Sequence, residues 1–369
     1  MTRYIIRRLL GAIPTLFICS LLIYAILLAA PGGPSARFAQ NPKVTPEARQ
    51  AFIHRWGLDQ PFYVQYCRWL GACNPNRDGA ATFLSNDGWP NLLPGFVGGG
   101  DNGVLHLDFG DSVTTGSPVS DAIGQRIPRT AILAGSALVI WLILALVTGM
   151  VAAVKRYSKI DTAITVFNYI GYSFPTFWLG LLLIIIFVMQ LGWFPAGGMW
   201  DVRLDDKPSF YFGSAEYWSF FQQHPLAILK DLGSHLVLPV ITLVAVSVAG
   251  DSRFVRASMI DALREDYVRT ARAKGVPERR VIYRHALRNA MLPVVTNMGL
   301  ELPFLFTGAI ATETIFSWPG MGRYFYEAVG AYDYPVLMGI LVITAVFVIG
   351  ANLLADIIYA IVDPRISYG

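Results

Sequence analysis

Six long apolar segments constrain this chain more than any other feature of its sequence. The hydrocarbon core of a bilayer is about 30 Å thick, and about 20 helical residues cross it. Helices are expected because every backbone polar group inside the bilayer must be hydrogen-bonded within the protein. The segments are Leu9–Ala30, Ala131–Val154, Thr162–Leu191, Leu236–Gly250, Ala290–Ala311 and Val336–Ile361. The sequence therefore predicts an all-α polytopic membrane protein with six transmembrane helices.

The composition supports a membrane protein and argues against several other classes. Hydrophobic residues make up 54% of the 369 residues and charged residues only 15%, whereas soluble proteins average about 45–50% and about 25%. Soluble globular, disordered and coiled-coil chains are poor fits. The first apolar segment follows Arg3, Arg7 and Arg8, as in a signal peptide, but its apolar run is longer than the about 7–15 residues typical of one. We expect it to be retained as a membrane anchor.

The placement of Lys and Arg predicts the orientation of the chain. Cytoplasmic loops are enriched in these residues. More than half of the 29 Lys and Arg fall in four regions that lie on one side if the chain crosses six times. These regions are the N-terminal tail, the turn 155–161, the loop 251–289 and the C-terminal tail. We therefore expect both termini inside the cell.

The chain is expected to have three parts. Residues 1–30 form a cytoplasmic tail with the first span, residues 31–128 an external loop, and residues 129–369 a five-helix core. The external loop is rich in Gly, Pro, Asn and Asp and too long for a simple connector, so we expect a small α-rich or irregular external insertion. The roles of 71–105 and of a second outer segment, 199–234, stay open. An aromatic belt or re-entrant helix is favoured for the second segment over a ligand platform.

Cysteine, histidine and phosphate-binding motifs are scarce. Cys67 and Cys73 lie on the predicted external, oxidising side, where a disulfide closing a small loop is plausible and free thiols are the alternative. Cys19 lies in the first span and is expected to act as a small apolar residue. No CxxC, HExxH or GxxxxGK[ST] motif occurs, so we expect no metal site and no cofactor. Any ATP that drives this protein must be bound by another chain.

The loop 251–289 is the most informative stretch. It holds ten Lys and Arg, and two helical pieces are predicted on either side of Gly275-Val276-Pro277. Gly275 suits a helix C-terminus with positive φ, and Pro277 suits the first turn of the next helix. Three interpretations compete. They are a solvated basic loop that touches anionic lipid, a nucleic-acid site, which the tether at the bilayer disfavours, and a short helix that docks into a cytoplasmic partner.

A resemblance supports the third interpretation. The stretch EDYVRTARAKGVPERRVIYRHALRNAMLPVV resembles the cytoplasmic loop of ABC importer permeases, in the form of the oligopeptide/dipeptide (peptide/nickel) subfamily. The generic family pattern is Glu-Ala-Ala, three residues, Gly, nine residues and Ile-x-Leu-Pro. Here Arg269-Thr270-Ala271 stand at the Glu-Ala-Ala positions, Gly275 is in its expected place, Leu287-Arg288 replace Leu-Pro, and Leu292-Pro293 follow five residues later. These departures match the peptide-type variant.

Further segments resemble the same subfamily along nearly the whole chain and in the same order. They are MTRYIIRRLLGAIPTLF, WGLDQPFYVQYCRWL, LDFGDSVTTGSPVSDAIGQRIPRTAIL, YSFPTFWLGLLLIIIF, ETIFSWPGMGRYFYEAVGAYDYPV and the terminal DPRI. They are similar to the permease half with a long first external loop. The resemblance therefore implies the type I importer permease fold.

The resemblance also implies a function and a set of partners. The chain is expected to be a transmembrane permease subunit, not an enzyme, that translocates di- or oligopeptides across a bacterial or archaeal cytoplasmic membrane. Its implied partners are the lipid bilayer, a second homologous permease subunit, two ATP-binding subunits that hydrolyse ATP and an external substrate-binding protein; no nucleic acid is expected. The short helix of the cytoplasmic loop is expected to sit in a cleft on one ATP-binding subunit. The implied contact residues are Asp266, Tyr267, Thr270, Ala271, Lys274 and Gly275.

The substrate path is harder to predict from the sequence. Polar side chains within the spans are candidates for lining it, because such groups are costly in a membrane unless paired. The alternative for each is a hydrogen bond between helices. The candidates are Asn168, Ser173, Thr176, Asn297 and Glu301.

Other functions fit the sequence less well. Within the same family, import of nickel chelates or of other small solutes is the alternative. A stand-alone secondary transporter would show paired repeats with broken helices, and a membrane-bound enzyme would show a catalytic constellation at a span or mouth. Neither pattern is found in the sequence.

Overall fold

Helices dominate the computed structural model of this chain. It describes residues 2–30, 45–47, 50, 53, 58–72, 103–200 and 214–362. Among these residues the only strand-like pairing is an isolated bridge between Asp111 and Pro118. The chain divides into two compact units, of which the first comprises 1–9, 128–323 and 347–369, and the second 10–127 and 324–346.

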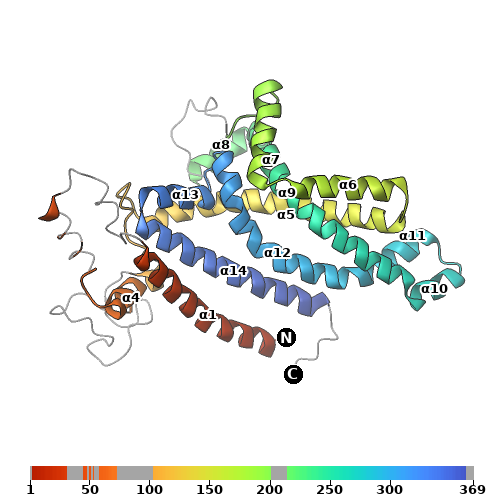
Figure 1. Cartoon of the computed structure of the whole chain (residues 1–369), viewed down its shortest axis with the longest axis horizontal. Helices are drawn as coiled ribbons and strands as arrows, with labels where there is room; N and C mark the ends of the chain where they lie inside the picture. The colour runs from red at the N-terminus through yellow and green to blue at the C-terminus, as the bar shows by residue number, and fades with distance from the viewer. Residues whose placement is uncertain are drawn as a thin grey trace. The chain divides into compact units, whose positions relative to one another are not determined.

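The helices are labelled in chain order in Figure 1. Their bounds are α1 Thr2–Ala29, α4 Phe62–Leu70, η2 Val104–His106, α5 Val119–Val154, α6 Lys159–Ser173, α7 Thr176–Leu183, η3 Ile184–Gln190, α8 Ala215–Gln223, α9 Pro225–Arg264, α10 Asp266–Ala273, α11 Glu278–Arg280, η5 Val281–Ala286, α12 Leu287–Ile315, α13 Met321–Ala331 and α14 Tyr334–Val362. The segments η3 and η5 are single π-helical stretches that follow α7 and α11.

The predicted all-α membrane fold is confirmed. Four of the described helices are long and apolar enough to cross a membrane, namely α1, α5, α9 and α14, and the bent pair of α6 with α7 and η3 makes a fifth span if counted as one. The predicted span Ala290–Ala311 falls within the 29 residues of α12, which is not among those helices. The count of six spans therefore stays a prediction.

The third span is bent by 100° between α6 and the helix that follows. Phe174 is extended, with φ −92° and ψ 131°, because the residue before a proline avoids the helical region. Pro175 then precedes the first residue of α7. The bend lies at Pro175 and divides the predicted segment Thr162–Leu191 into two helices.

The fourth span is much longer than predicted. Instead of ending at Gly250, α9 continues without interruption to Arg264 and so includes the first part of the predicted cytoplasmic loop. The reason is packing, because Asp251, Val255 and Met259 recur at helical spacing and are each at most 1% exposed. This buried stripe outweighs the roughly 1 kcal/mol that a glycine costs inside a helix.

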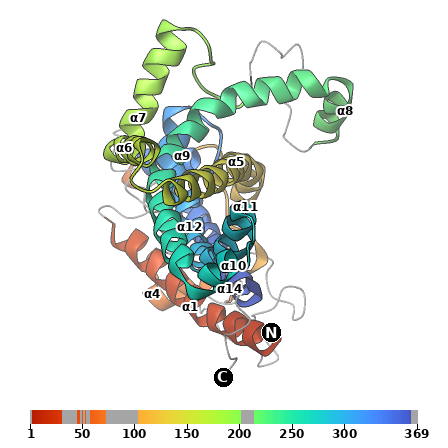
Figure 2. The ribbon, with the colours of Figure 1, turned by 90° about the vertical axis from the view of Figure 1, so that its right-hand side faces the viewer.

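The core of the first unit lies where α9 packs against α5 and α12. Its fully buried members include Leu133, Trp141, Val255 and Val294. In Figures 1 and 2 α9 runs beside both α6 and α12, in agreement with their extensive contacts. The turn between α5 and α6 and the helices α10 and α11 gather at the same end of this unit.

In the second unit, aromatic side chains of α1 and α4 form the central contact. The rings of Tyr24 and Tyr66 lie 5.6 Å apart and those of Tyr24 and Trp69 5.2 Å apart. Tyr66 Oη and Ser20 Oγ are hydrogen-bonded at 2.8 Å. Cys67, on the same helix α4, is disulfide-bonded. Its predicted partner Cys73 lies outside the described residues, so the pairing of these two cysteines stays a prediction.

A buried carboxylate fixes the turn after α12 in the first unit. Glu313 is 0% exposed and accepts hydrogen bonds from Thr130 Oγ1 at 2.7 Å and from the Arg323 N–H at 3.0 Å. Thr130 Oγ1 in turn accepts the Met321 N–H at 2.8 Å. A Cβ added at Gly320 would collide with the Glu313 carboxylate. The glycine is thus required by the close approach of the turn to this side chain.

We predict that Gly320→Ala lowers the midpoint of thermal unfolding, equivalent to a loss of about 1–3 kcal/mol, because overpacking forces the Glu313 carboxylate to move. The matched control is Gly330→Ala in α13, where an added Cβ meets nothing within 4 Å and better helix propensity leaves the midpoint unchanged or slightly higher. If the two variants unfold at the same midpoint in detergent, this result would contradict the requirement for glycine at position 320.

Candidate functional site

The short helix α10 has one buried and one exposed face. It begins after Glu265, whose extended backbone (φ −64°, ψ 149°) ends α9. Val268 is 0% and Ala271 7% exposed, and both pack into the core of the first unit. The remaining side chains of α10 are exposed. The helix is therefore anchored from within and presents its other face to the surroundings.

The chain leaves α10 through a left-handed glycine. Gly275 has φ +73°, and its N–H donates to Arg272 O at 2.9 Å while the Val276 N–H donates to Ala271 O at 3.2 Å. This is the C-terminal pattern predicted for Gly275. Nothing lies within 4 Å of a Cβ built there, so the backbone conformation and not the available space requires glycine. Pro277 stands just before α11 and not in its first turn.

An ion pair spans this turn. Arg272 Nε and Nη2 donate to the two Glu278 carboxylate oxygens at 3.1 and 2.7 Å. This two-point contact joins the last turn of α10 to the first residue of α11, and it holds the pKa of Glu278 below its usual range. Both side chains are about half exposed, so the pair closes the turn without being part of the core.

Beyond the turn, the chain continues as a helix into α12. Val276 packs against the core, and Val281 and Ala286 are 0% exposed. The backbone stays helical from α11 through η5 into α12, with φ −58° and ψ −44° at the junction residue Leu287. The turn thus links α9 and α12, two helices that also pack against each other.

Basic side chains surround a hollow beside the same turn. It has a volume of about 460 Å³ and is lined by Pro277, Arg279, Arg280, Tyr283 and Arg284. The Arg279 guanidinium lies 6.0 Å from the centre of the Tyr283 ring. The hollow and the exposed face of α10 give this end of the unit an exposed surface rich in arginine.

Five of the six predicted coupling residues lie on the exposed side of this segment. Asp266, Tyr267, Thr270, Lys274 and Gly275 are all exposed. Ala271 is a correction to the predicted contact surface, because it is buried three residues after Val268 on the inner face. Two positions three apart lie on the same side of a helix, so the small residue permits close packing inside the chain.

The predicted path residues do not form one cluster. Asn297 Nδ2 donates to Asp251 Oδ1 at 2.9 Å, which is the alternative interpretation of a hydrogen bond between helices. Ser173 Oγ donates to its own helix at Tyr169 O. Thr176 is half-buried at the start of α7, and the side chain of Glu301 lies outside the described part of α12.

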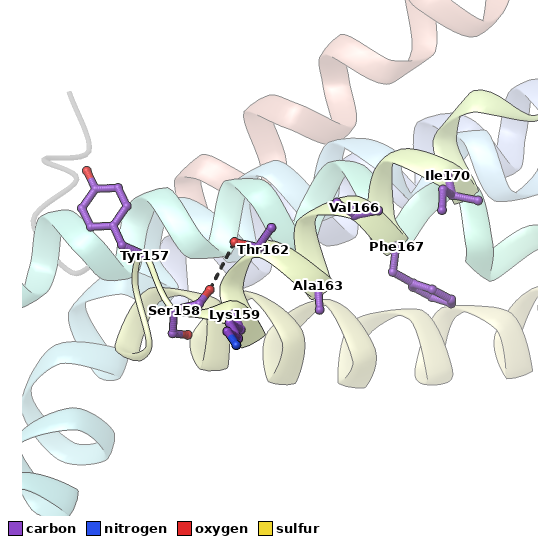
Figure 3. Close-up of a pocket in the computed structure, with 8 residues that line it drawn as sticks. All are labelled: Tyr157, Ser158, Lys159, Thr162, Ala163, Val166, Phe167 and Ile170. Atoms are coloured by element: carbon purple, nitrogen blue, oxygen red, sulfur yellow. Dashed lines mark hydrogen bonds between the residues drawn. The ribbon is translucent and has the colours of Figure 1, made fainter.

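Asn168 is buried, at 5% exposed, and lies on the wall of a largely apolar cavity of about 610 Å³. Residues of α5, α6, α7 and α9 line this cavity. A second, shallower groove of about 600 Å³ runs along α6. Figure 3 shows its lining residues, Tyr157, Ser158, Lys159, Thr162, Ala163, Val166, Phe167 and Ile170. An apolar stripe with a lysine at one end is typical of a helix surface at a membrane boundary.

Sequence analysis missed the ion pair that fixes the turn between α5 and α6. Asp161 is 5% exposed and accepts from Arg256 Nε at 2.8 Å and Nη2 at 2.7 Å, and from the Tyr157 N–H at 2.9 Å. Ser158 Oγ accepts the Asp161 N–H. Ser158 and Asp161 have the spacing of an N-terminal capping box, a signal that could have indicated a role for Asp161, although not its partner on α9.

Comparison with known proteins gives the family. Residues 145–368 match the family model of the binding-protein-dependent transport system inner membrane component, and residues 1–92 match the model of the N-terminal region of such membrane components. The chain belongs to this family of transporter permeases. The resemblance predicted from the cytoplasmic loop is thereby confirmed.

Relatives of the permease match it over its full length. It is 39% identical to the oligopeptide transport system permease protein AppB of Bacillus subtilis, with 100% of both chains covered. It is 36% identical to the di/tripeptide transport system permease protein DppB of Pseudomonas aeruginosa, with 100% of this chain and 99% of the relative covered. The glutathione transport system permease protein GsiC of Escherichia coli is also 36% identical, with 100% of both covered.

A solved structure agrees in fold. A chain of the MetNI methionine ABC transporter, in an inward-facing conformation, matches 65% of the permease and 96% of its own length with a TM-score of 0.50 and 14% sequence identity. At this low sequence identity the match supports the fold alone.

We predict a small coupling free energy of about 0.2–1 kcal/mol between Arg272 and Glu278 in a double-mutant cycle of Arg272→Gln and Glu278→Gln, because the pair is half exposed. Because the folded pKa of Glu278 is lowered from 4.5, this stabilisation is complete above that pH and lost as the pH falls through the folded pKa.

The cycle is measured from unfolding midpoints at neutral pH and near pH 4. The control pair is Arg269 and Asp266 on the same helix, 3.4 Å apart with side chains 72% and 95% exposed, which should show no coupling. If the Arg272 and Glu278 cycle also shows no coupling free energy at neutral pH, this result would count against a role of the ion pair in closing the turn.

Proposed function

We propose that this permease is a subunit of an ATP-driven importer for di- and oligopeptides. Three relatives that match it end to end are named as transporters of oligopeptides, of di- and tripeptides, and of glutathione, itself a small peptide. A shared peptide cargo is the simplest property that unites those names.

The observation that carries the proposed mechanism is the anchoring of the turn between α10 and α11. An element that passes on motion must be rigid, docked and attached to helices that have two packings. Here the inner face of α10 is fixed by Val268 and Ala271, while its outer face is open to a partner. Movement of that partner would be transmitted directly to α9 and α12.

The assembly follows from this mechanism. The permease pairs with a second homologous subunit. Two cytoplasmic ATP-binding subunits bind α10 and the corresponding helix of that second subunit, and an external protein delivers the peptide. Hydrolysis takes place on the ATP-binding subunits, and this chain performs no catalysis. The chain lies in the inner membrane with both termini in the cytoplasm, on the side of α10 and of the basic turn 155–161.

Affinity purification in mild detergent followed by reconstitution tests the proposal. A tagged permease should bring down a second permease chain and ATP-binding chains, and proteoliposomes with the external binding protein should accumulate labelled peptides only when ATP is supplied. Accumulation by the lone chain would contradict the class of transporter. ATP-dependent uptake of nickel chelates or other solutes but not of peptides would contradict the cargo.

We predict that Gly275→Val uncouples ATP hydrolysis from transport. A β-branched residue at φ +73° is strained by about 1–3 kcal/mol, so the turn should shift and the peptide uptake per ATP should fall roughly tenfold.

The matched variant Gly275→Asn should retain most uptake, because asparagine tolerates the left-handed region. The measurement is peptide uptake and ATP hydrolysis in the same proteoliposomes. Equal coupling ratios in wild type and Gly275→Val would count against this turn as the coupling element.

A further inference from the structure

An arginine and two tyrosines lie together on an exposed face between α6 and α9. The Arg253 guanidinium carbon is 5.1 Å from the centre of the Tyr169 ring and 5.4 Å from that of Tyr172. The tyrosines are 52% and 57% exposed, and Arg253 is exposed as well. None of the three belongs to the predicted coupling or path residues.

The guanidinium points back toward the membrane-spanning part of α9. Arg253 Nε donates to Ala249 O at 3.0 Å, one turn toward the start of the helix. Gly171, between the two tyrosines in sequence, packs so closely on α9 that an added Cβ would lie 2.9 Å from Ala245 O. The charged group therefore lies at the level of residues 245–249, within the apolar segment.

The depth along α6 leads to the same conclusion. Tyr169 and Tyr172 follow the first residue of α6, Lys159, by ten and thirteen positions, which at 1.5 Å per residue is about 15–20 Å along the helix. Lys159 lies in the basic turn at the predicted cytoplasmic boundary. The tyrosine side of the cluster is thus removed from that boundary, whereas the Arg253 backbone lies nearer to it, less than one turn from Arg256, which pairs with Asp161.

Arg253 has no counter-charge among the described residues, in contrast to its neighbour on α9. Arg256, less than one turn further along, is neutralised by the buried Asp161, whereas Arg253 forms no ion pair with any residue that the structure describes. An uncompensated arginine at membrane depth is costly toward lipid, and such residues face a water-filled path or another protein surface. Of these two surroundings, only a water-filled path leaves the exposed guanidinium accessible to a ligand, and we take the open face of the cluster to border this path.

The chemistry of the cluster suits one kind of ligand. Of the five guanidinium N–H groups, one is used by Ala249 O, and the others are available in the fork that matches a carboxylate. The two rings fix the plane of the guanidinium through cation–π contacts. Resting on the proposed function, we propose that Arg253, held by Tyr169 and Tyr172, binds the C-terminal carboxylate of a peptide as it passes through the permease.

The test compares a labelled tripeptide with its C-terminal amide, which lacks the negative charge. Proteoliposomes contain the full transporter with wild-type permease, Arg253→Gln, Arg253→Lys or the control Lys230→Gln, which removes an exposed positive charge from the same helix outside the predicted span. All use the same external binding protein, so its own preference for free carboxylates cancels between variants. Basal ATP hydrolysis and subunit co-purification check that each variant assembles.

The expected result is selective. Arg253→Gln should lower uptake of the free peptide at least about tenfold, as expected for a lost hydrogen bond to a charged group, with little change for the amide. Arg253→Lys keeps the positive charge but loses the forked guanidinium donors, so its uptake of the free peptide should lie between those of wild type and Arg253→Gln. This variant provides the test if Arg253→Gln does not assemble. Lys230→Gln should match wild type.

Other outcomes overturn the inference in different ways. Unchanged free-peptide uptake in Arg253→Gln, or an equal loss for free and amidated peptides, would show that the cluster has a structural role or binds a lipid phosphate instead. If the wild-type transporter imports neither peptide, the proposed function itself fails, and this result is distinct from failure of the Arg253 assignment.

Discussion

The structure depends on the continuous burial of one side of α9. This helix runs for 40 residues, and its buried positions extend from the apolar span past Asp251 to Met259 and Ala262. Because α6 and α12 pack along the same helix, a displacement at one end of α9 cannot be absorbed by a loop before it reaches the span. The turn between α10 and α11, the Asp161 ion pair and the Arg253 cluster are all positioned by this helix.

The coupling role that we propose for the turn between α10 and α11 sets two opposite requirements. Its inner side needs fixed packing, which Val268 and Val281 provide at 0% exposure. Its outer side needs to stay accessible and polar, as the half-exposed Arg272 and Glu278 are. A glycine in the left-handed region ends α10, and only the four residues 274–277 connect it to α11. A flexible loop would satisfy the second requirement but would transmit no motion.

Three buried carboxylates are each held by several hydrogen bonds. Asp161 is matched by Arg256 and a backbone N–H, and Glu313 by Thr130 and a backbone N–H. In the second unit Asp333 accepts from Ser112 Oγ at 2.6 Å and from two backbone N–H groups. Each is a satisfied group that fixes a turn. Arg253, by contrast, is exposed and forms no ion pair with a described residue, which makes it a candidate for ligand binding.

The sequence alone predicted the helical membrane fold, the family and the break of the cytoplasmic loop at Gly275, because hydropathy, glycine and a distinctive motif are local signals. It did not predict that α9 passes through Gly250, that Ala271 faces inward, or that Asn297 is bonded to Asp251.

Those features were decided by tertiary structure. Which face of a helix is buried depends on the neighbours that pack against it, and which acid meets which base depends on residues such as Asp161 and Arg256 that lie 95 positions apart. Spacing along one segment shows that two residues share a face. Only the packing of α6, α9 and α12 shows what that face touches.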